Sequence, residues 1–162
     1  MQTIDRDEVS IHMAARPEDV YDLVSDVTRT PEFSPEVISS TWLDGATGPA
    51  VGARFKARNK VQRGPGWNNK PVVTVADRGR EFAFTRTELG GGTMLWRYTF
   101  EPDGNGTRVT ESYEMLQPLT RFMWFVIERI CGRHDRRSDL RGGMQLTLDR
   151  VRAVAEKGAL TT

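Results

Sequence analysis

Four side chains capable of acid–base chemistry fall among apolar residues of this 162-residue sequence: Arg86, Tyr98, Glu111 and Tyr113. Apolar surroundings raise the pKa of a carboxyl group, which suits it to exchange a proton near neutral pH. A tyrosine hydroxyl or a guanidinium nearby can stabilise an enolate oxygen. For a catalytic site, the sequence therefore predicts Glu111 as the group that accepts or donates a proton. Arg86, Tyr98 and Tyr113 would stabilise the reacting oxygen.

The same side chains admit other interpretations. A non-catalytic carrier would use them to anchor one polar end of an apolar ligand, such as a carboxylate or a phenol. Arg86 and Glu111 would instead form a purely structural salt bridge if they lie together, because an unpaired buried charge costs several kcal/mol. A β-bulge that turns one of them outward would remove that cost.

Alternation along the predicted strands assigns these residues to one face. Four inward rows follow from it: Phe55, Ala57, Asn59 and Val61; Phe82, Phe84 and Arg86; Met94, Trp96, Tyr98 and Phe100; and Val109, Glu111, Tyr113 and Met115. These rows are the covered face, because only the C-terminal helix is available to cover the sheet. Polar groups within them predict an internal cavity in which they meet ligand or water.

Seven stretches are predicted to form the strands: 8–13, 37–43, 53–61, 71–76, 81–88, 93–101 and 107–115. Glycine-bearing turns at near-regular spacing favour antiparallel hairpins over parallel β–α–β units. Pro17 and apolar residues at helical spacing predict a short helix over 17–24. Pro31 and Pro35 bracket a tight turn or a second short helix.

The chain after Pro118 is predicted to be helical. One apolar stripe steps by three or four residues: Leu140, Met144, Leu148, Val151 and Ala155. Gly132 and the pair Gly142–Gly143 predict a kinked helix, or a short helix followed by a longer one. The expected fold is α+β: a single domain over 1–162, with a curved antiparallel sheet of six or seven strands around a long C-terminal helix.

Composition excludes several classes of function. Lys+Arg of 23 and Asp+Glu of 22 give a net charge of +1, which lacks the basic excess of a nucleic-acid-binding surface. The basic stretch 133–137, with Arg141, is interpreted as a solvated helix end or turn. Cys131 is the single cysteine, so no intrachain disulfide is expected and a reducing cytoplasm fits. The apolar segment 122–130 is too short for stable membrane insertion, and residues 1–8 do not resemble a signal peptide.

Metal and cofactor chemistry is not predicted. Cys131 and His134 supply two ligands, whereas zinc sites use three or four, and His12 is expected on the surface. Neither histidine lies near a nucleophile elbow. The glycine clusters 64–66 and 90–92 lack the lysine and helix of a phosphate loop, so they are predicted to be turns or loops at the cavity opening.

Two apolar features of the sequence are expected to be shielded from water. Trp67 lies in a proline- and glycine-rich loop and is expected to fold over the cavity opening or under the loop. The segment 122–127 is apolar on every side of a helix, which predicts a homodimer interface through 122–130 or a pocket lid, in preference to membrane contact. The predicted ligand-binding side chains are Asn59, Trp67, Phe84, Trp96, Tyr98, Tyr113 and Met144.

The sequence resembles the START-like superfamily, most closely its polyketide cyclase/dehydrase and lipid transport branch. The similar segments are VGARFKARN at 51–59, Trp67, REFAF at 80–84, WRYTF at 96–100, GTRVTESYE at 106–114, PEDVY at 17–21 and VSD at 24–26. They span almost the whole chain, but they are packing and turn residues rather than a catalytic motif. The resemblance implies a helix-grip fold with an internal cavity.

Three hypotheses for the function remain after this resemblance is considered, since a fold alone does not fix an activity. The first is a binding protein for an apolar, aromatic, polyketide-like or lipid-like small molecule. The second is a cyclase, aromatase or dehydratase that uses Glu111 with Arg86, Tyr98 or Tyr113. The third is a protein-interaction module whose cavity is structural and whose apolar helix recruits a partner.

Overall fold

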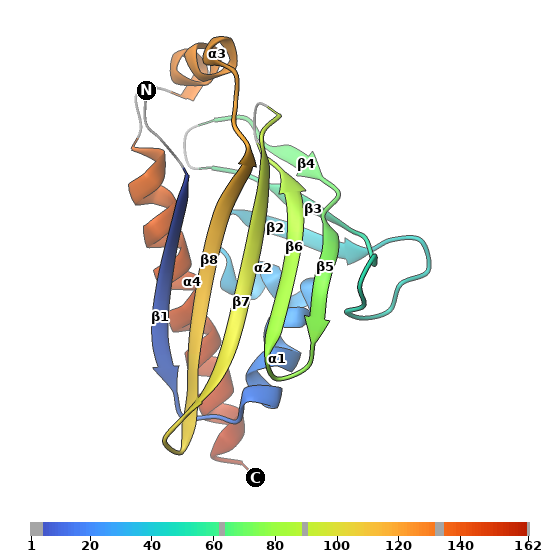
Figure 1. Cartoon of the computed structure of the whole chain (residues 1–162), viewed down its shortest axis with the longest axis vertical. Helices are drawn as coiled ribbons and strands as arrows, with labels where there is room; N and C mark the ends of the chain where they lie inside the picture. Colours follow the sequence, from blue (N-terminus) through green and yellow to red (C-terminus); the bar gives the residue numbers. More distant parts are fainter. Residues whose placement is uncertain (1–4, 62–63, 89–90, 132–134, 162) are drawn as a thin grey trace.

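Residues with period-two alternation form a five-stranded antiparallel sheet in the computed structural model, which describes residues 5–61, 64–88, 91–131 and 135–161. Its strands, in spatial order, are β1 (Arg6–Met13), β8 (Gly106–Gln117), β7 (Thr93–Asp103), β6 (Glu81–Thr87) and β5 (Val72–Asp77). The chain therefore starts in an edge strand that pairs with the last strand of the sheet (Figure 1).

A second sheet of three short antiparallel strands lies behind the first (Figure 1). It consists of β2 (Val37–Trp42), β3 (Phe55–Asn59) and β4 (Trp67–Asn69). The sheets meet where β3 and β5 begin, through a bridge between Arg54 and Val72. There the amide N–H of Val73 also donates to the carbonyl of Ala53 at 2.9 Å. The three-stranded sheet is thus attached along one end of the larger one.

The expected fold class, α+β with a curved antiparallel sheet and a C-terminal helix, is confirmed. The described residues contain eight strands in two sheets, where six or seven strands were expected. Trp67, expected in a loop, instead begins the extra strand β4, where it pairs with Asn59. Three residues between glycine- and proline-rich turns are too few to show a period of two in sequence.

Short helices connect β1 to β2, as expected. They are α1 (Pro17–Ser25), the 3₁₀ turn η1 (Val27–Arg29) and α2 (Thr30–Phe33). A proline in the first turn begins both α helices, where its missing N–H costs no intrahelical bond. α1 buries Val20, Tyr21 and Val24, and Tyr21 makes edge contacts with two phenylalanine rings of the large sheet.

The C-terminal segment forms a short helix followed by a longer one: α3 (Arg121–Cys131) and α4 (Arg136–Ala159). Asp135 caps α4, accepting a hydrogen bond from the amide of Ser138 at 3.1 Å. The expected stripe of α4 is buried: Leu140, Met144, Leu148, Val151 and Ala155. Helix α4 passes through Gly142–Gly143 without interruption. The expected break at Gly132 lies outside the described residues.

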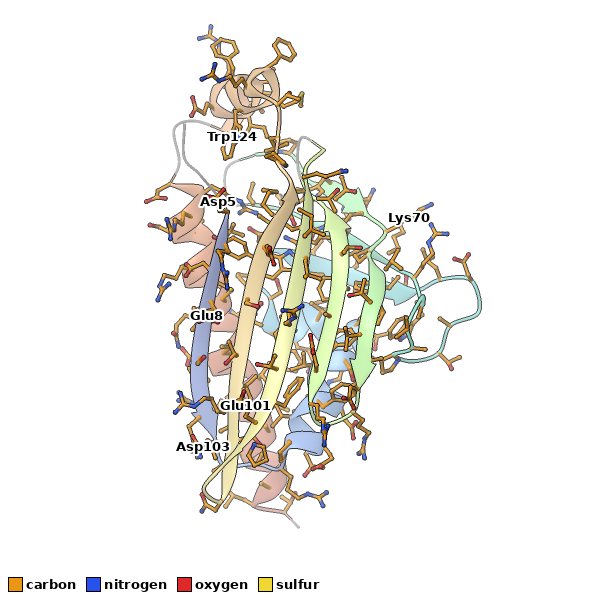
Figure 2. All side chains as sticks on the ribbon, in the orientation of Figure 1. Asp5, Glu8, Lys70, Glu101, Asp103 and Trp124 are labelled. Carbon is orange, nitrogen blue, oxygen red and sulfur yellow. The ribbon has the colours of Figure 1, made fainter. Side chains whose placement is uncertain are left out.

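Helix α3 stands at one end of the molecule (Figure 1). Its Trp124 lies on the side toward the body and packs against the core (Figure 2). The opposite side leaves Phe122 72% exposed and Phe125 64% exposed. None of the helices in the described residues is long and apolar enough to cross a membrane.

Candidate functional site

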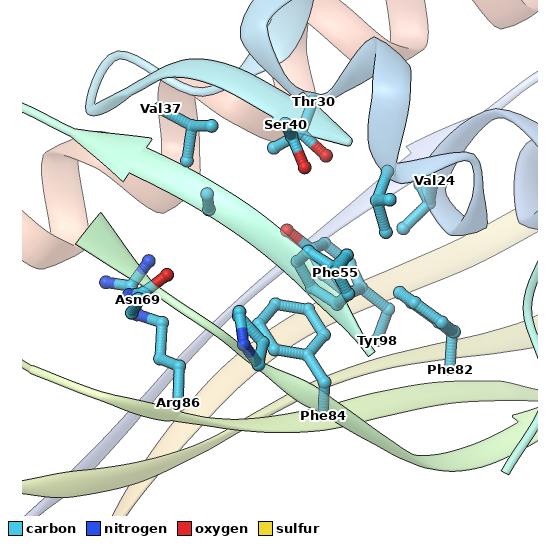
Figure 3. Close-up of a pocket in the computed structure, with 13 residues that line it drawn as sticks. Val24, Thr30, Val37, Ser40, Phe55, Asn69, Phe82, Phe84, Arg86 and Tyr98 are labelled. Atoms are coloured by element: carbon cyan, nitrogen blue, oxygen red, sulfur yellow. The ribbon is translucent and has the colours of Figure 1, made fainter. Parts of the chain in front are cut away.

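A small cavity lies between the two sheets, and α1 and η1 cover one side of it (Figure 3). Its volume is about 40 Å³. The walls are mostly apolar and aromatic: Val24, Val27, Thr30, Val37, Ser40, Phe55, Ala57, Asn69, Pro71, Phe82, Phe84, Arg86 and Tyr98. Phe55 and Phe84 reach across the gap and meet edge to face with ring centres 5.3 Å apart.

The cavity brings together three of the residues singled out from sequence, Phe84, Arg86 and Tyr98. Its volume is far below the ~300–1,000 Å³ of a drug-sized site and suits a few water-sized molecules. The other predicted side chains do not line this cavity: Asn59, Trp67, Trp96, Glu111, Tyr113 and Met144. Their roles as ligand contacts or catalytic groups stay predictions.

Tyr98 and Glu111 form a hydrogen-bonded pair between β7 and β8. They are directly opposite in the strand register, so both side chains point to the covered face. The Tyr98 hydroxyl donates to Oε1 of Glu111 at 2.8 Å. Burial raises the pKa of Glu111 to about 8, although the hydrogen bond from Tyr98 and the charge of Arg86 act to lower it. Near neutral pH the carboxyl group is therefore mainly protonated.

One oxygen of this carboxyl group has no protein partner. Oε2 of Glu111 is buried, yet no hydrogen bond reaches it from the described residues. Tyr98 separates Glu111 from the cavity that Tyr98 itself lines. A protonated acid with an unused oxygen can donate a proton or a hydrogen bond to a carbonyl group placed beside it.

Arg86 does not pair with Glu111, although both face inward as expected. Its Nε donates to Oε1 of Glu88 in a very short contact, and its Nη2 donates to Oε2 of the same carboxylate at 3.1 Å. Glu36 lies 3.7 Å from Nη2. Burial acts to lower the pKa of Arg86, but the charges of Glu88 and Glu36 outweigh it and raise the pKa.

Arg136 completes a cluster of four charges with these residues. It forms a very short ion pair with Glu36 and lies 4.0 Å from Glu88. Its side chain is only 22% exposed, so the interpretation of this basic stretch as a solvated helix end is wrong for Arg136. Burial acts to raise the pKa of Glu36, yet the pKa is lowered because Arg136 and Arg86 stabilise the carboxylate.

This charge cluster (Arg86, Glu88, Glu36 and Arg136) was missed in the sequence. The one available signal was alternation, because Glu88 is two residues after Arg86 within the expected strand 81–88 and would face the same way. Glu36 precedes β2 and Arg136 begins α4, so only the folded chain brings them to Arg86. The cluster holds three separate segments together at one place.

Trp96 and Tyr113 pack against each other, with ring centres 5.5 Å apart. Arg86 lies over the Trp96 ring, 4.7 Å from its centre, in a cation–π contact. Trp96 donates from its indole N–H to Glu88 at 3.3 Å. The Tyr113 hydroxyl is buried without a partner among the described residues, and burial is the main reason that its pKa is raised.

Two further predicted residues, Asn59 and Trp67, lie opposite each other on β3 and β4. Oδ1 of Asn59 and the indole nitrogen of Trp67 are both buried and unpaired within the described part of the chain. His134, discussed above as an insufficient metal ligand, is outside the described residues.

Comparison with known proteins gives one family. The family model described as polyketide cyclase / dehydrase and lipid transport matches residues 6–156. A search among curated proteins found no match.

Solved structures with the same fold are numerous and distant in sequence. The di-domain ARO/CYC StfQ from the steffimycin biosynthetic pathway is similar with a TM-score of 0.76 and 15% identity, over 95% of this chain and 51% of that one. Protein CV1439 from Chromobacterium violaceum gives 0.68 and 16%, over 94% and 98%. Ara h 8.0201 gives 0.64 and 14%, over 93% and 96%. At these identities the likeness shows the fold alone.

Proposed function

The chain belongs to the polyketide cyclase / dehydrase and lipid transport family, and on that premise we propose that its 162 residues act as one domain that binds an apolar, aromatic or polyketide-like small molecule between its two sheets. The observation that supports it is the cavity between the sheets, whose walls are aromatic and aliphatic apart from a few polar groups. A small number of polar groups in an apolar cavity is typical of ligand sites, where they orient the ligand.

Ligand entry requires the cavity to widen, because about 40 Å³ is too small for an aromatic molecule. The three-stranded sheet is attached to the large sheet where β3 and β5 begin. At the opposite end of the three-stranded sheet, Glu36, which precedes β2, pairs with Arg86 on β6. Side-chain contacts break more readily than strand pairing, so this second end is where we expect the sheets to separate.

The test is titration with the neutral fluorescent probe N-phenyl-naphthylamine. The wild-type protein should bind it saturably, with a blue shift of its emission. Ala57→Leu places a larger side chain in the cavity and should weaken binding about tenfold or more, the equivalent of 1.4 kcal/mol. Lys56→Leu is the matched control, because Lys56 is the exposed neighbour on the same strand.

Circular dichroism checks that Ala57→Leu is still folded, because a larger side chain can overpack a protein interior. Ala57→Val fills less of the cavity and serves as a second variant. A wild-type protein without saturable binding contradicts the proposed function. Equal affinities of Ala57→Leu and Lys56→Leu would place the probe outside this cavity.

A second candidate function, proton-transfer catalysis of the cyclase or dehydratase type, is favoured by Glu111. The acid is buried, mainly protonated near neutral pH, and has a free oxygen. In a dehydration it would protonate the departing hydroxyl group as the carbon–oxygen bond breaks, and water would leave. The Glu111 carboxylate so formed would accept the proton lost from the α-carbon as the carbon–carbon double bond forms, which restores the acid. With a β-hydroxyketone as substrate, Glu111→Gln should abolish water loss while probe binding persists. Water loss at the wild-type rate in that variant would exclude Glu111 as the acid.

A further inference from the structure

Unpaired polar atoms are concentrated on the inner face of the three-stranded sheet. Among the buried side-chain nitrogen and oxygen atoms that lack a hydrogen-bond partner in the described part of the chain, four belong to β2, β3 and β4. They are Oγ of Ser40, Oδ1 of Asn59, the indole nitrogen of Trp67 and Oδ1 of Asn69. Buried polar groups in proteins nearly always have partners, so such a concentration needs an explanation.

Two of the four atoms lie in one row that faces the cavity. The strand register pairs Ser40 with Ala57, and Ala57 with Asn69. All three residues line the cavity, and Ser40 and Asn69 are only 7% and 5% exposed. Ala57, at the centre of this row, has only a methyl group as its side chain. Space therefore remains between the side chains of Ser40 and Asn69 (Figure 3).

The hydrogen bonds of Asn69 fix what it offers to a ligand. Its amide nitrogen donates to the Thr87 carbonyl at 3.3 Å, so the unpaired atom is the acceptor Oδ1. An acceptor requires a partner that brings an O–H or N–H group. Ser40 is less restrictive, because a hydroxyl group both donates and accepts.

The opposite wall does not compete for these groups. It presents the aromatic rings of Phe84 and Tyr98, and the Tyr98 hydroxyl is directed to Glu111. Arg86 also lies there, but its Nε and Nη2 are engaged by Glu88 and Glu36. A ligand in this cavity would therefore have aromatic surface on one side and two free polar atoms on the other.

We propose that the row Ser40–Ala57–Asn69 is the polar subsite of the cavity and selects a flat, fused-ring ligand that carries hydroxyl groups near both ends. This inference rests on the proposed function, since it names the class of ligand that the cavity takes. Neighbouring strands are about 4.8 Å apart, so Ser40 and Asn69 flank β3 by about two such spacings. That separation matches a molecule of two or three fused six-membered rings, not a single small polar group.

The experiment compares two neutral probes of equal shape. One is a naphthalenediol with hydroxyl groups at opposite ends, and the other is the dimethylnaphthalene with methyl groups in their place. Wild-type protein should bind the diol at least about tenfold more tightly, because only the diol satisfies the buried polar atoms. Calorimetric titration of both probes measures the ratio.

Variants locate the preference. Asn69→Leu and Ser40→Ala should each lower the diol affinity about tenfold and leave the dimethylnaphthalene affinity unchanged or higher. Asn68→Leu and Ser39→Ala are matched controls, because both residues are the exposed neighbours on the same strands, and neither should alter the ratio. Retained dimethylnaphthalene binding shows that a variant is folded, and Ser40→Ala tests the proposal if Asn69→Leu is unstable.

The possible failures are distinguishable. Equal affinities for the two probes, or a preference for the diol that survives both variants, would overturn the subsite while cavity binding stands. A wild-type protein that binds neither probe would overturn the subsite and the proposed function together.

Discussion

At the scale of single residues, the balance between burial and charged partners decides the charge of the inner carboxyl groups. Glu36 and Glu111 are both withdrawn from water. The pKa of Glu36 is lowered because two arginines stabilise its carboxylate, whereas burial raises the pKa of Glu111 because the hydrogen bond from Tyr98 and the charge of Arg86 only partly offset the loss of water. One fold thus keeps an ionised and a protonated carboxyl group in the same interior.

The raised pKa of Glu111 predicts a particular dependence of stability on pH. The folded protein holds this proton up to about pH 8, whereas the unfolded chain releases it around its ordinary value of 4.5. The stabilisation from Glu111 is complete below the unfolded pKa and is lost as pH rises toward the folded one. The free energy of unfolding should therefore fall by about 1.4 kcal/mol per pH unit between them from this residue alone.

Glu111→Gln removes that slope, so its stability relative to wild type should increase steadily from pH 5 to pH 8. Urea denaturation across this range measures the difference. Glu114→Gln, at an exposed position on the same strand, controls for the loss of one acid. Parallel pH profiles of wild type and Glu111→Gln would show that the buried acid is not protonated.

The inward position of these residues was predictable, and their partners were not. Strict alternation placed Arg86, Tyr98 and Glu111 on the covered face, and the structure agrees because the β6–β7 and β7–β8 registers have no bulge at these positions. A mutual Arg86–Glu111 salt bridge was one expectation from sequence, and no such ion pair occurs in the described residues. Arg86 instead forms an ion pair with Glu36, which belongs to a distant segment of the chain. Local sequence patterns cannot reveal such a contact.

At the scale of elements, the charge cluster connects β6, the segment before β2 and the first turn of α4. A buried ion pair contributes little net stability compared with apolar residues of similar size, but breaking it leaves a charge stranded in a low-dielectric interior. The cluster therefore matters mainly as a constraint on how these three segments are placed.

Glu88→Met should destabilise the protein by about 3–5 kcal/mol, because Arg86 loses its closest counter-charge while it stays buried. The double variant Arg86→Met/Glu88→Met should recover most of that loss, since Glu36 and Arg136 remain paired. Chemical denaturation gives both values. Arg78→Met, which breaks the exposed pair with Asp22, should have a much smaller effect. A double variant no more stable than Glu88→Met would contradict this account.

Elements with a long repeating pattern were predictable, and short ones were not. The stripe of α4 spans several turns, so its buried face was evident despite Gly142–Gly143, whose helix-breaking tendency is outweighed by tertiary packing. β4 is only three residues long and carries no pattern of its own. Its pairing with β3 created the polar row that the sequence did not indicate.

At the scale of the whole molecule, α3 leaves large apolar side chains exposed to solvent. Phe122 and Phe125 point away from the body, while Trp124 anchors the helix to it. An exposed apolar helix face is an unfavourable surface in water, and a second copy of the chain would cover it. The homodimer expected from sequence thus stays a prediction with a defined surface.

Sedimentation velocity over a range of concentrations should show self-association of the wild-type protein. Phe122→Glu/Phe125→Glu should shift it to the monomer, because two buried charges would oppose the interface. Val51→Glu alters another exposed apolar residue and should leave the association unchanged. A wild-type protein that sediments as a monomer at every concentration would exclude this interface.

The pairing of β1 with β8 has a consequence for how the chain reaches this structure. The side chains of Ser10 and Thr110 share a hydrogen bond although they are 100 residues apart in sequence. During synthesis the first strand must wait for nearly the whole chain before its partner emerges from the ribosome. Contacts of such long range slow folding, because the entropy of closing a large loop is lost before the pairing stabilises it. The nascent chain will thus carry β1 without its partner until β8 has been made, which leaves a strand edge open to pairing with other chains.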